Sequence, residues 1–206
     1  MNNQEALLSY FKEGVIEAGC DEAGRGCLAG PVVAAAVILP SDFTHPLLND
    51  SKKINEKNRY KLRTEIENIA VDYAVGIIDN KGIDEINILK ASIMSMHKAL
   101  DKLTIRPEHI IIDGNKFIKY QDIPYQTIVK GDSKYYSIAA ASILAKTYRD
   151  DIMNELHEKH PEYNWKKNKG YPTKQHRQAI KEFGTTPYHR MSFRLLDEQL
   201  SFDFSS

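Results

Sequence analysis

The chain has 206 residues, of which 42% are hydrophobic and 27% are charged. These values predict one globular domain spanning residues 1–206 and exclude collagen-like and disordered chains. Lysine plus arginine and aspartate plus glutamate total 28 each, so the formal net charge is zero. Any surface that binds a polyanion must therefore be local.

The cysteines and the apolar runs indicate the compartment. Cys20 and Cys27 have no other cysteine or histidine at zinc-finger spacing, which disfavours both a disulfide framework and a zinc site. The longest apolar run, residues 32–39, is far shorter than the roughly 18 residues that suggest a membrane span. The polar start lacks the pattern of a signal peptide. We therefore expect a cytoplasmic protein with no membrane partner.

The first half of the chain predicts a sheet with one helical insertion. After a weakly helical stretch over residues 4–13, strands are predicted over 15–22 and 31–39, joined by a glycine-rich turn. A helix over 56–69 and a strand over 71–79 follow. Three strands in this order favour an antiparallel meander.

The second half alternates helices and strands. Apolar residues at three- and four-residue steps predict a helix over 86–103, and strands over 109–113 and 125–130 come next. An alanine-rich helix over 137–160 indicates close packing against a sheet. Because this alternation favours parallel pairing, we predict an α/β fold with a mixed sheet. From about residue 160 to 206, basic and aromatic residues predict a helical appendage and a tail.

Four acidic residues lie near the carboxyl ends of predicted strands, where open α/β sheets place their ligands. They are Asp21, Glu22, Asp113 and Asp132. Taken alone, Asp113 and Asp132 suit turns or helix caps equally well. Carboxylates that converge repel one another unless a cation such as Mg²⁺ or Mn²⁺ lies between them. Four acids provide room for two ions, which suits phosphoryl displacement.

Six blocks of the sequence resemble, in order, the motifs of bacterial ribonuclease HII. They extend from about residue 15 to residue 193 and cover nearly the whole chain. A single motif would be weak support, whereas six in order are specific. The blocks are GCDEAGRGCLAGPVVAAAVIL, NDSKKI, IIIDGNKF, VKGDSKYYSIAAASILAKTYRD, KGYPTKQH and PYHRMSF.

The resemblance implies a ribonuclease H-like fold, with a five-stranded mixed sheet, flanking helices and a helical C-terminal portion. It implies an endonuclease that cuts 5′ to ribonucleotides in duplex DNA and in RNA–DNA hybrids, using two Mn²⁺ or Mg²⁺ ions and leaving 3′-hydroxyl and 5′-phosphate ends. The processes implied are ribonucleotide excision and removal of RNA primers. The four acids match the metal-binding and catalytic positions of the family.

The same resemblance implies two contacts that recognise sugars. Gly24, Arg25 and Gly26 match the turn whose backbone reads the ribose 2′-hydroxyl, and Tyr171 matches the tyrosine at the junction from RNA to DNA. Glycines permit close approach of a backbone, and the 2′-hydroxyl distinguishes RNA from DNA. The structural alternatives are a half-buried tyrosine and a surface arginine in a turn. Further substrate contacts are expected from Lys52, Asn87 and Lys146, although a lysine is often merely solvated.

The chain departs from the family pattern in two places. Cys27 stands where proline is common, and a small apolar side chain there should preserve the turn. The chain also ends soon after PYHRMSF, so we expect the lack of an extended C-terminal arm to weaken substrate affinity more than chemistry.

The last residues resemble the peptides that bind the bacterial sliding clamp. Gln199, Leu200, Phe202 and Phe204 supply the polar and apolar anchors of such a peptide. The alternative is a terminal helix that packs against the body. For the whole chain, the alternatives are ribonuclease HIII, disfavoured because Asp21 lies too near the start for a preceding domain, and a non-catalytic binding module, disfavoured by the cost of keeping four acids together.

Overall fold

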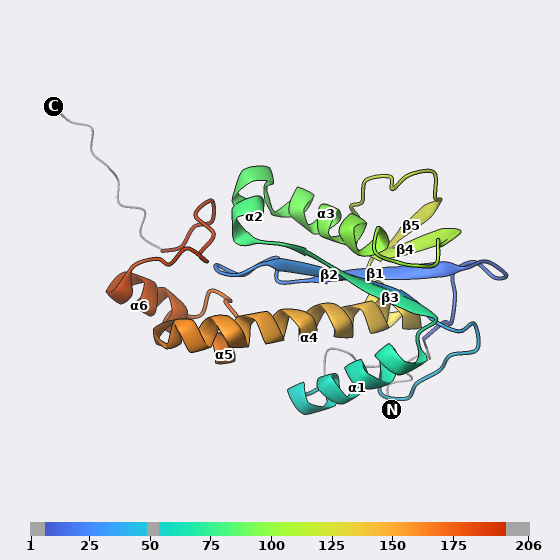
Figure 1. Cartoon of the computed structure of the whole chain (residues 1–206), viewed down its shortest axis with the longest axis horizontal. Coiled ribbons are helices and arrows are strands. Elements are labelled where there is room, and N and C mark those ends of the chain that lie inside the picture. The colour runs from blue at the N-terminus through green and yellow to red at the C-terminus, as the bar shows by residue number, and fades with distance from the viewer. Residues whose placement is uncertain (1–6, 49–53, 197–206) are drawn as a thin grey trace.

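A mixed five-stranded sheet forms the centre of the computed structural model, which describes residues 7–48 and 54–196 (Figure 1). The strand order is β3-β2-β1-β4-β5. The antiparallel strands are β1 (Glu17–Ala23), β2 (Val32–Ile38) and β3 (Asp72–Ile78). Parallel to β1 run β4 (His109–Asp113) and β5 (Tyr125–Ile128). The predicted meander followed by parallel strands is confirmed.

Helices cover both faces of the sheet (Figure 1). On one face α4 (Tyr136–Lys159) crosses β1 and β2, and α1 (Glu56–Ile69) packs beside it. On the other face lie α2 (Asn80–Ile86) and α3 (Ile88–Leu100). The shorter elements are η2 (Gly131–Ser133), η3 (Pro161–Tyr163), α5 (Trp165–Asn168) and α6 (Lys174–Phe183).

Close approach of α4 to β1 fixes the centre of the molecule. A side chain at Gly19 would bring a Cβ within 2.4 Å of the Ser137 carbonyl carbon, so glycine is required there. The first turns of α4 bury Ala139, Ala140 and Ala141 completely. Small residues on both elements thus let the helix axis lie near the strand. As a result, η2, which precedes α4 in the chain, lies at the end of the sheet where β4 ends.

Two helix predictions differ from the structure. Residues 7–13 are not helical, because the amides of Phe11 and Lys12 donate to the Glu17 carboxylate. The helix predicted over 86–103 is broken at Asn87, whose φ of 68° cannot continue a helix. The Asn87 side chain instead accepts from the Lys90 amide at 3.1 Å and caps α3.

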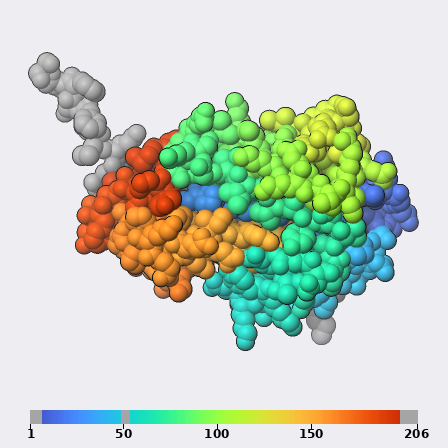
Figure 2. Space-filling view, in the orientation of Figure 1, coloured from blue at the N-terminus to red at the C-terminus, as the bar shows by residue number. Residues whose placement is uncertain are grey.

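The C-terminal helices pack against the far end of α4 (Figures 1 and 2). Trp165 and Tyr163 are buried there and their rings stack with centroids 5.0 Å apart. Met153 and Leu156 of α4 complete this cluster. Aromatic residues in the predicted basic appendage therefore form a core of its own, which joins the appendage to the sheet domain. Among the described residues, no helix is long and apolar enough to cross a membrane.

Candidate active site

The pairing of β1 explains why acids gather at one end of the sheet. Its pairing with β4 ends at Cys20 and Ile112, whereas its pairing with β2 continues to Ala23. Asp21 and Glu22 therefore lie within β1, near its carboxyl end, on a stretch that has no β4 residue beside it. Asp113 is the last residue of β4, directly after Ile112. Strands β1 and β4 thus bring their acids to the same end of the sheet.

Backbone amides hold these carboxylates in place. Asp21 accepts from the Glu22 amide at 2.7 Å. Asp113 accepts from the Gly131 amide at 2.6 Å, which ties the end of β4 to η2. Asp132 is the next residue of η2 and is 6% exposed. The connection between Asp113 and Gly131 thus brings the fourth acid to the same end of the sheet as the other three.

The carboxylates at this end of the sheet repel one another. Burial, with added repulsion from Glu22 and Asp113, raises the pKa of Asp21 to about 8. The charge of Lys146 opposes this shift, so Lys146 lies close enough to affect Asp21 electrostatically. Burial also raises the pKa of Glu22, against the effect of Arg25, whose Nη1 lies 3.0 Å from Glu22 Oε1. These carboxylates are kept together at a cost in free energy.

The donor chemistry of the four acids fits a hard divalent cation. All four offer oxygen ligands, and the repulsion around Asp21 is what a cation would relieve. Within the described residues, no three His, Cys, Asp or Glu side chains are grouped tightly enough to enclose an ion. To bind a cation, the side chains of the four acids would therefore have to move closer together. Their backbone positions at this end of the sheet would not have to change.

The glycine turn that follows β1 is shaped by a buried arginine. Gly24 has a φ of +93°, and a Cβ there would lie 2.0 Å from Arg149 Nε, so only glycine fits. Arg25 and Gly26 are exposed. A Cβ placed on Gly26 would meet only Tyr171, with Cε1 at 4.0 Å. The predicted 2′-hydroxyl turn and the predicted junction tyrosine are thus neighbours.

Tyr171 presents its ring to solvent from a fixed backbone. The side chain is 48% exposed, next to the turn. Its amide donates to the Asn168 carbonyl at 2.9 Å, and its carbonyl accepts from His176 Nδ1 at 3.0 Å. Cys27 is fully buried beside it, as expected for a small apolar substitute in the turn.

Two buried histidines support that backbone. Because His176 Nδ1 donates to Tyr171, its Nε2 accepts, from Trp165 Nε1 at 3.0 Å and from His189 Nε2 at 3.3 Å. His189 Nδ1 in turn accepts from the Thr186 amide at 2.9 Å. Burial, and then the proximity of His176, lower the pKa of His189 to about 4. Burial lowers the pKa of His176 as well, so both rings are neutral at pH 7 and serve as structural residues.

Two arginines near the turn were not predicted as part of the site. Arg149 stands next to Asp150 and Asp151 in the sequence, where a surface ion pair would be ordinary, but it is 2% exposed. It donates to the carbonyls of Pro31, Lys169 and Ala29 at 2.7–3.1 Å. Arg190 is fully buried and is likewise bound to carbonyls. Its position in PYHRMSF was the only signal in the sequence.

The remaining predicted substrate contacts are Lys146, Asn87 and Lys52. Lys146 donates to Ser142 one helical turn away, and Asn87 is exposed between α2 and α3. Lys52 and the predicted clamp peptide, residues 199–204, lie outside the described residues.

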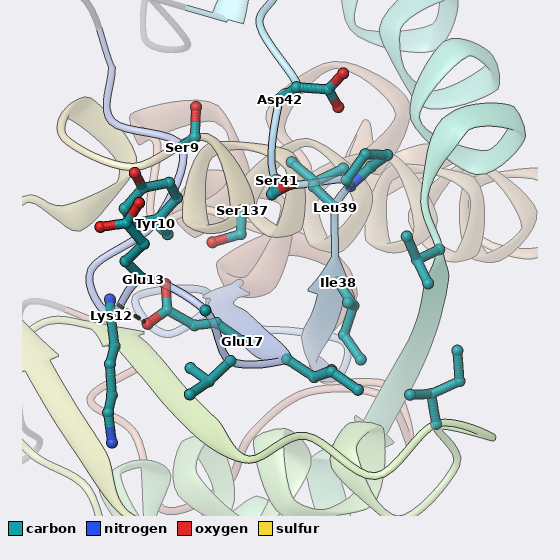
Figure 3. Close-up of a pocket in the computed structure, with 16 residues that line it drawn as sticks. Ser9, Tyr10, Lys12, Glu13, Glu17, Ile38, Leu39, Ser41, Asp42 and Ser137 are labelled. Carbon is teal, nitrogen blue, oxygen red and sulfur yellow. Dashed lines mark hydrogen bonds between the residues drawn. The ribbon is translucent and has the colours of Figure 1, made fainter.

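The opposite end of β1 contains a cavity of about 670 Å³, which is separate from the acids (Figure 3). Its buried carboxylate, Glu17, already accepts from the amides of Phe11 and Lys12 at 2.9 and 3.1 Å. Glu17 also lies 2.8 Å from His109 Nδ1. Because both of its oxygens accept hydrogen bonds, Glu17 is a structural residue. The cavity is therefore a weaker candidate for catalysis than the end of the sheet where the four acids lie.

Comparison with known proteins gives a consistent result. The sequence model of the family Ribonuclease HII matches residues 18–196. The chain is 65% identical over 199 residues to ribonuclease HII of Bacteroides thetaiotaomicron, covering 96% of this chain and 100% of the relative. It is 61% identical over 198 residues to ribonuclease HII of Christiangramia forsetii, with the same coverage.

Solved structures share the fold. Ribonuclease H2 of Pyrococcus horikoshii aligns with a TM-score of 0.75 at 27% identity, over 87% of this chain and 94% of that one. The ribonuclease HII in a complex with PCNA from Archaeoglobus fulgidus also has a TM-score of 0.75 at 27% identity, over 90% and 98%. A Bst ribonuclease HIII solved with Mn²⁺ aligns at 0.64 and 19% identity, over 94% and 69%, which shows likeness of fold alone.

The raised pKa of Asp21 predicts that this carboxyl destabilises the metal-free protein. Between its ordinary pKa of 3.8 and about 8, the folded state keeps a proton that the unfolded state releases, so stability falls as pH rises. Asp21→Asn removes this effect. In EDTA, we expect the variant to have a higher Tm than the wild type at pH 8, with a smaller difference at pH 5. Asp122→Asn is the control because its side chain is 95% exposed. A lower Tm for Asp21→Asn at pH 8 would contradict the prediction.

Proposed function

Since the chain belongs to the ribonuclease HII family and is thus a ribonuclease H, we propose that it cuts 5′ to ribonucleotides embedded in duplex DNA and in RNA–DNA hybrids. The observation that carries this proposal is the closeness of Gly26 to Tyr171: a Cβ built on Gly26 would lie 4.0 Å from Tyr171 Cε1. Arg25 of the same turn pairs with Glu22, which supports the proposal that two contacts with the sugar of the substrate lie near the carboxylates.

Together, the two contacts with the sugars select a junction between a ribonucleotide and a deoxyribonucleotide. Exposed amides in the turn can donate to a ribose 2′-hydroxyl, which deoxyribose lacks. The Tyr171 ring favours a deoxyribose on the next nucleotide, because C2′ then carries no hydroxyl to desolvate. One contact requires a hydroxyl and the other disfavours it. A single embedded ribonucleotide satisfies both.

The four acids would hold divalent metal, and we propose two ions, Mn²⁺ or Mg²⁺. Such ions activate water and stabilise the leaving oxygen of an in-line displacement. The protein's own part is to orient the ligands: the Gly131 amide fixes Asp113, and the Glu22 amide fixes Asp21. Arg25 is paired with Glu22 and adds positive charge where a phosphate would approach.

Replacement of an acid should remove cleavage without removing binding. We expect Asp113→Asn to lose at least on the order of a hundred-fold in rate, since metal stabilisation is worth several kcal/mol. Asn still accepts from Gly131, so the fold is kept, and Asp122→Asn serves as the matched control. The assay compares a single ribonucleotide in duplex DNA, a long RNA–DNA hybrid and plain DNA, each with Mg²⁺ or Mn²⁺.

Three results of this assay would contradict the proposal. Near-wild-type cleavage by Asp113→Asn at saturating metal would remove that acid from the reaction. Cleavage of the hybrid alone would indicate the specificity of ribonuclease HIII. Products with a 2′,3′-cyclic phosphate, in place of 3′-hydroxyl and 5′-phosphate ends, would mean that the ribose attacks instead of water.

The junction role of Tyr171 can be tested separately. Stacking on a nucleic-acid group contributes about 1–3 kcal/mol, so Tyr171→Ala should slow cleavage at a single ribonucleotide about ten- to a hundred-fold. Tyr171→Phe keeps the ring and should stay near the wild-type rate. Metal affinity, measured by titration calorimetry, should be unchanged in both. An unaltered rate for Tyr171→Ala would leave the tyrosine with a structural role only.

We also propose that the tail binds a sliding clamp. The support is the peptide pattern of Gln199, Leu200, Phe202 and Phe204, together with the complex of PCNA with ribonuclease HII from Archaeoglobus fulgidus. A synthetic peptide of residues 195–206 should bind the bacterial clamp with a Kd on the order of micromolar, as expected for a short motif with few anchors. The double variant Leu200→Ala, Phe204→Ala should not bind, while it cleaves oligonucleotides normally. Failure of the full-length protein to bind the clamp would reject this partner.

A further inference from the structure

The guanidinium of Arg190 binds the glycine turn from inside the protein. Arg190 is 0% exposed, and in the described chain its guanidinium donates only to backbone carbonyls. Nη2 lies 2.7 Å from the Gly24 carbonyl oxygen and Nη1 lies 3.0 Å from that of Arg25. Nε and Nη2 also reach the carbonyls of Gly30 and Pro31 at 3.0 and 3.1 Å. One side chain thus holds both ends of the turn.

These contacts determine which way the peptide groups of the turn face. In a trans peptide the C=O and N–H bonds point in opposite directions. The Gly24 carbonyl shares its peptide group with the Arg25 amide, and the Arg25 carbonyl shares its group with the Gly26 amide. Because Arg190 draws both carbonyls inward, both amides face outward.

The outward amides are available to a ligand. Neither the Arg25 nor the Gly26 amide donates to an acceptor within the part of the chain that the structure describes. Both residues are exposed, and Gly26 lies next to the Tyr171 ring. Two successive amide donors without a partner in the described chain, beside an aromatic ring, suit a hydroxyl oxygen of a sugar.

Arg190 is itself held from three directions. Its amide donates to the Leu28 carbonyl at 2.8 Å, and the Gly30 amide donates to Tyr188 at 2.9 Å. The Asp84 carboxylate accepts from the amides of Met191 and Ser192 at 2.9 and 3.0 Å. These contacts fix the position of the planar Arg190 guanidinium. A flexible lysine ammonium cannot reproduce its arrangement of donors.

We infer that Arg190 is a positioning residue for sugar recognition: it orients the Arg25 and Gly26 amides toward the 2′-hydroxyl without touching the substrate. This inference rests on the proposed function and adds the residue that sets its selectivity.

The test measures preference for the ribonucleotide, because a merely structural defect would weaken binding to every duplex alike. In the Asp113→Asn background, fluorescence anisotropy gives the Kd for a duplex with one ribonucleotide and for the same duplex in all-DNA form. We expect the parent to prefer the ribonucleotide. Arg190→Lys should lose about five- to ten-fold of that preference, the value of one or two neutral hydrogen bonds, with all-DNA affinity nearly unchanged. Arg190→Gln is the second variant in case the lysine variant does not fold.

Leu62→Ala is the control for lost stability, because Leu62 is buried between α1 and α4, in a core cluster that contains no residue of the turn. It should lower the Tm and keep the preference. An unchanged preference in a folded Arg190 variant, or equal binding of both duplexes by the parent, would overturn the inference. Failure of the wild type to cut at a ribonucleotide would instead overturn the proposed function, so the two failures are distinguishable.

Discussion

Burial of two guanidinium groups under the β1–β2 turn is the interaction on which the rest of the site depends. A buried charge is costly unless hydrogen bonds satisfy it, and Arg149 and Arg190 meet that need with carbonyls alone. The carbonyls come from the turn itself and from Lys169, two residues before Tyr171. The turn and the tyrosine therefore share one support, and neither can shift without leaving a charge unsatisfied.

The acids carry negative charge, whereas the groups buried beneath the turn carry positive charge. Strand β1 contains Asp21 and Glu22 and leads directly into the turn. Asp21 and Glu22 lie on the open edge beyond the last β1–β4 pair, where they repel each other. A few residues later the chain enters a region of buried positive charge. A divalent cation at the acids would relieve the repulsion in the first region. The second region is satisfied by the protein's own backbone, so it remains rigid whether or not metal is bound.

The sequence predicted the elements whose determinants are local. The helix over 56–69 has the expected bounds, because Asn55 caps it by accepting from the Asn58 amide at 2.9 Å. Motifs proposed the four acids and Tyr171 as site residues, whereas the closeness of Tyr171 to Gly26 depends on the tertiary fold. The helix predicted over residues 4–13 is wrong in its described part, residues 7–13, where the Glu17 carboxylate accepts from the amides of Phe11 and Lys12.

What the sequence could not provide were contacts between distant segments. The break at Asn87 depends on a backbone with a φ of 68° and a ψ of 162°, which the residue type alone does not predict. Arg149 beside Asp150 favours a surface pair by any local rule, and only the tertiary fold turns it inward. Arg190 stands in a recognisable block, but its partners lie at the other end of the chain. Residue type alone does not separate a guanidinium that binds carbonyls from one that binds phosphate.

The separation of Arg190 from Gly24, 166 residues along the chain, also bears on how the protein matures during synthesis. The ribosome delivers β1 early and Arg190 near the end, and a domain generally folds as a unit. An unfinished chain that already carries all four acids still lacks the side chain that orients the turn. The four acids are therefore synthesised before their turn can be held by Arg190. If Arg190 orients the turn as inferred above, selection of ribose over deoxyribose would be acquired only when the C-terminal segment packs beneath the turn.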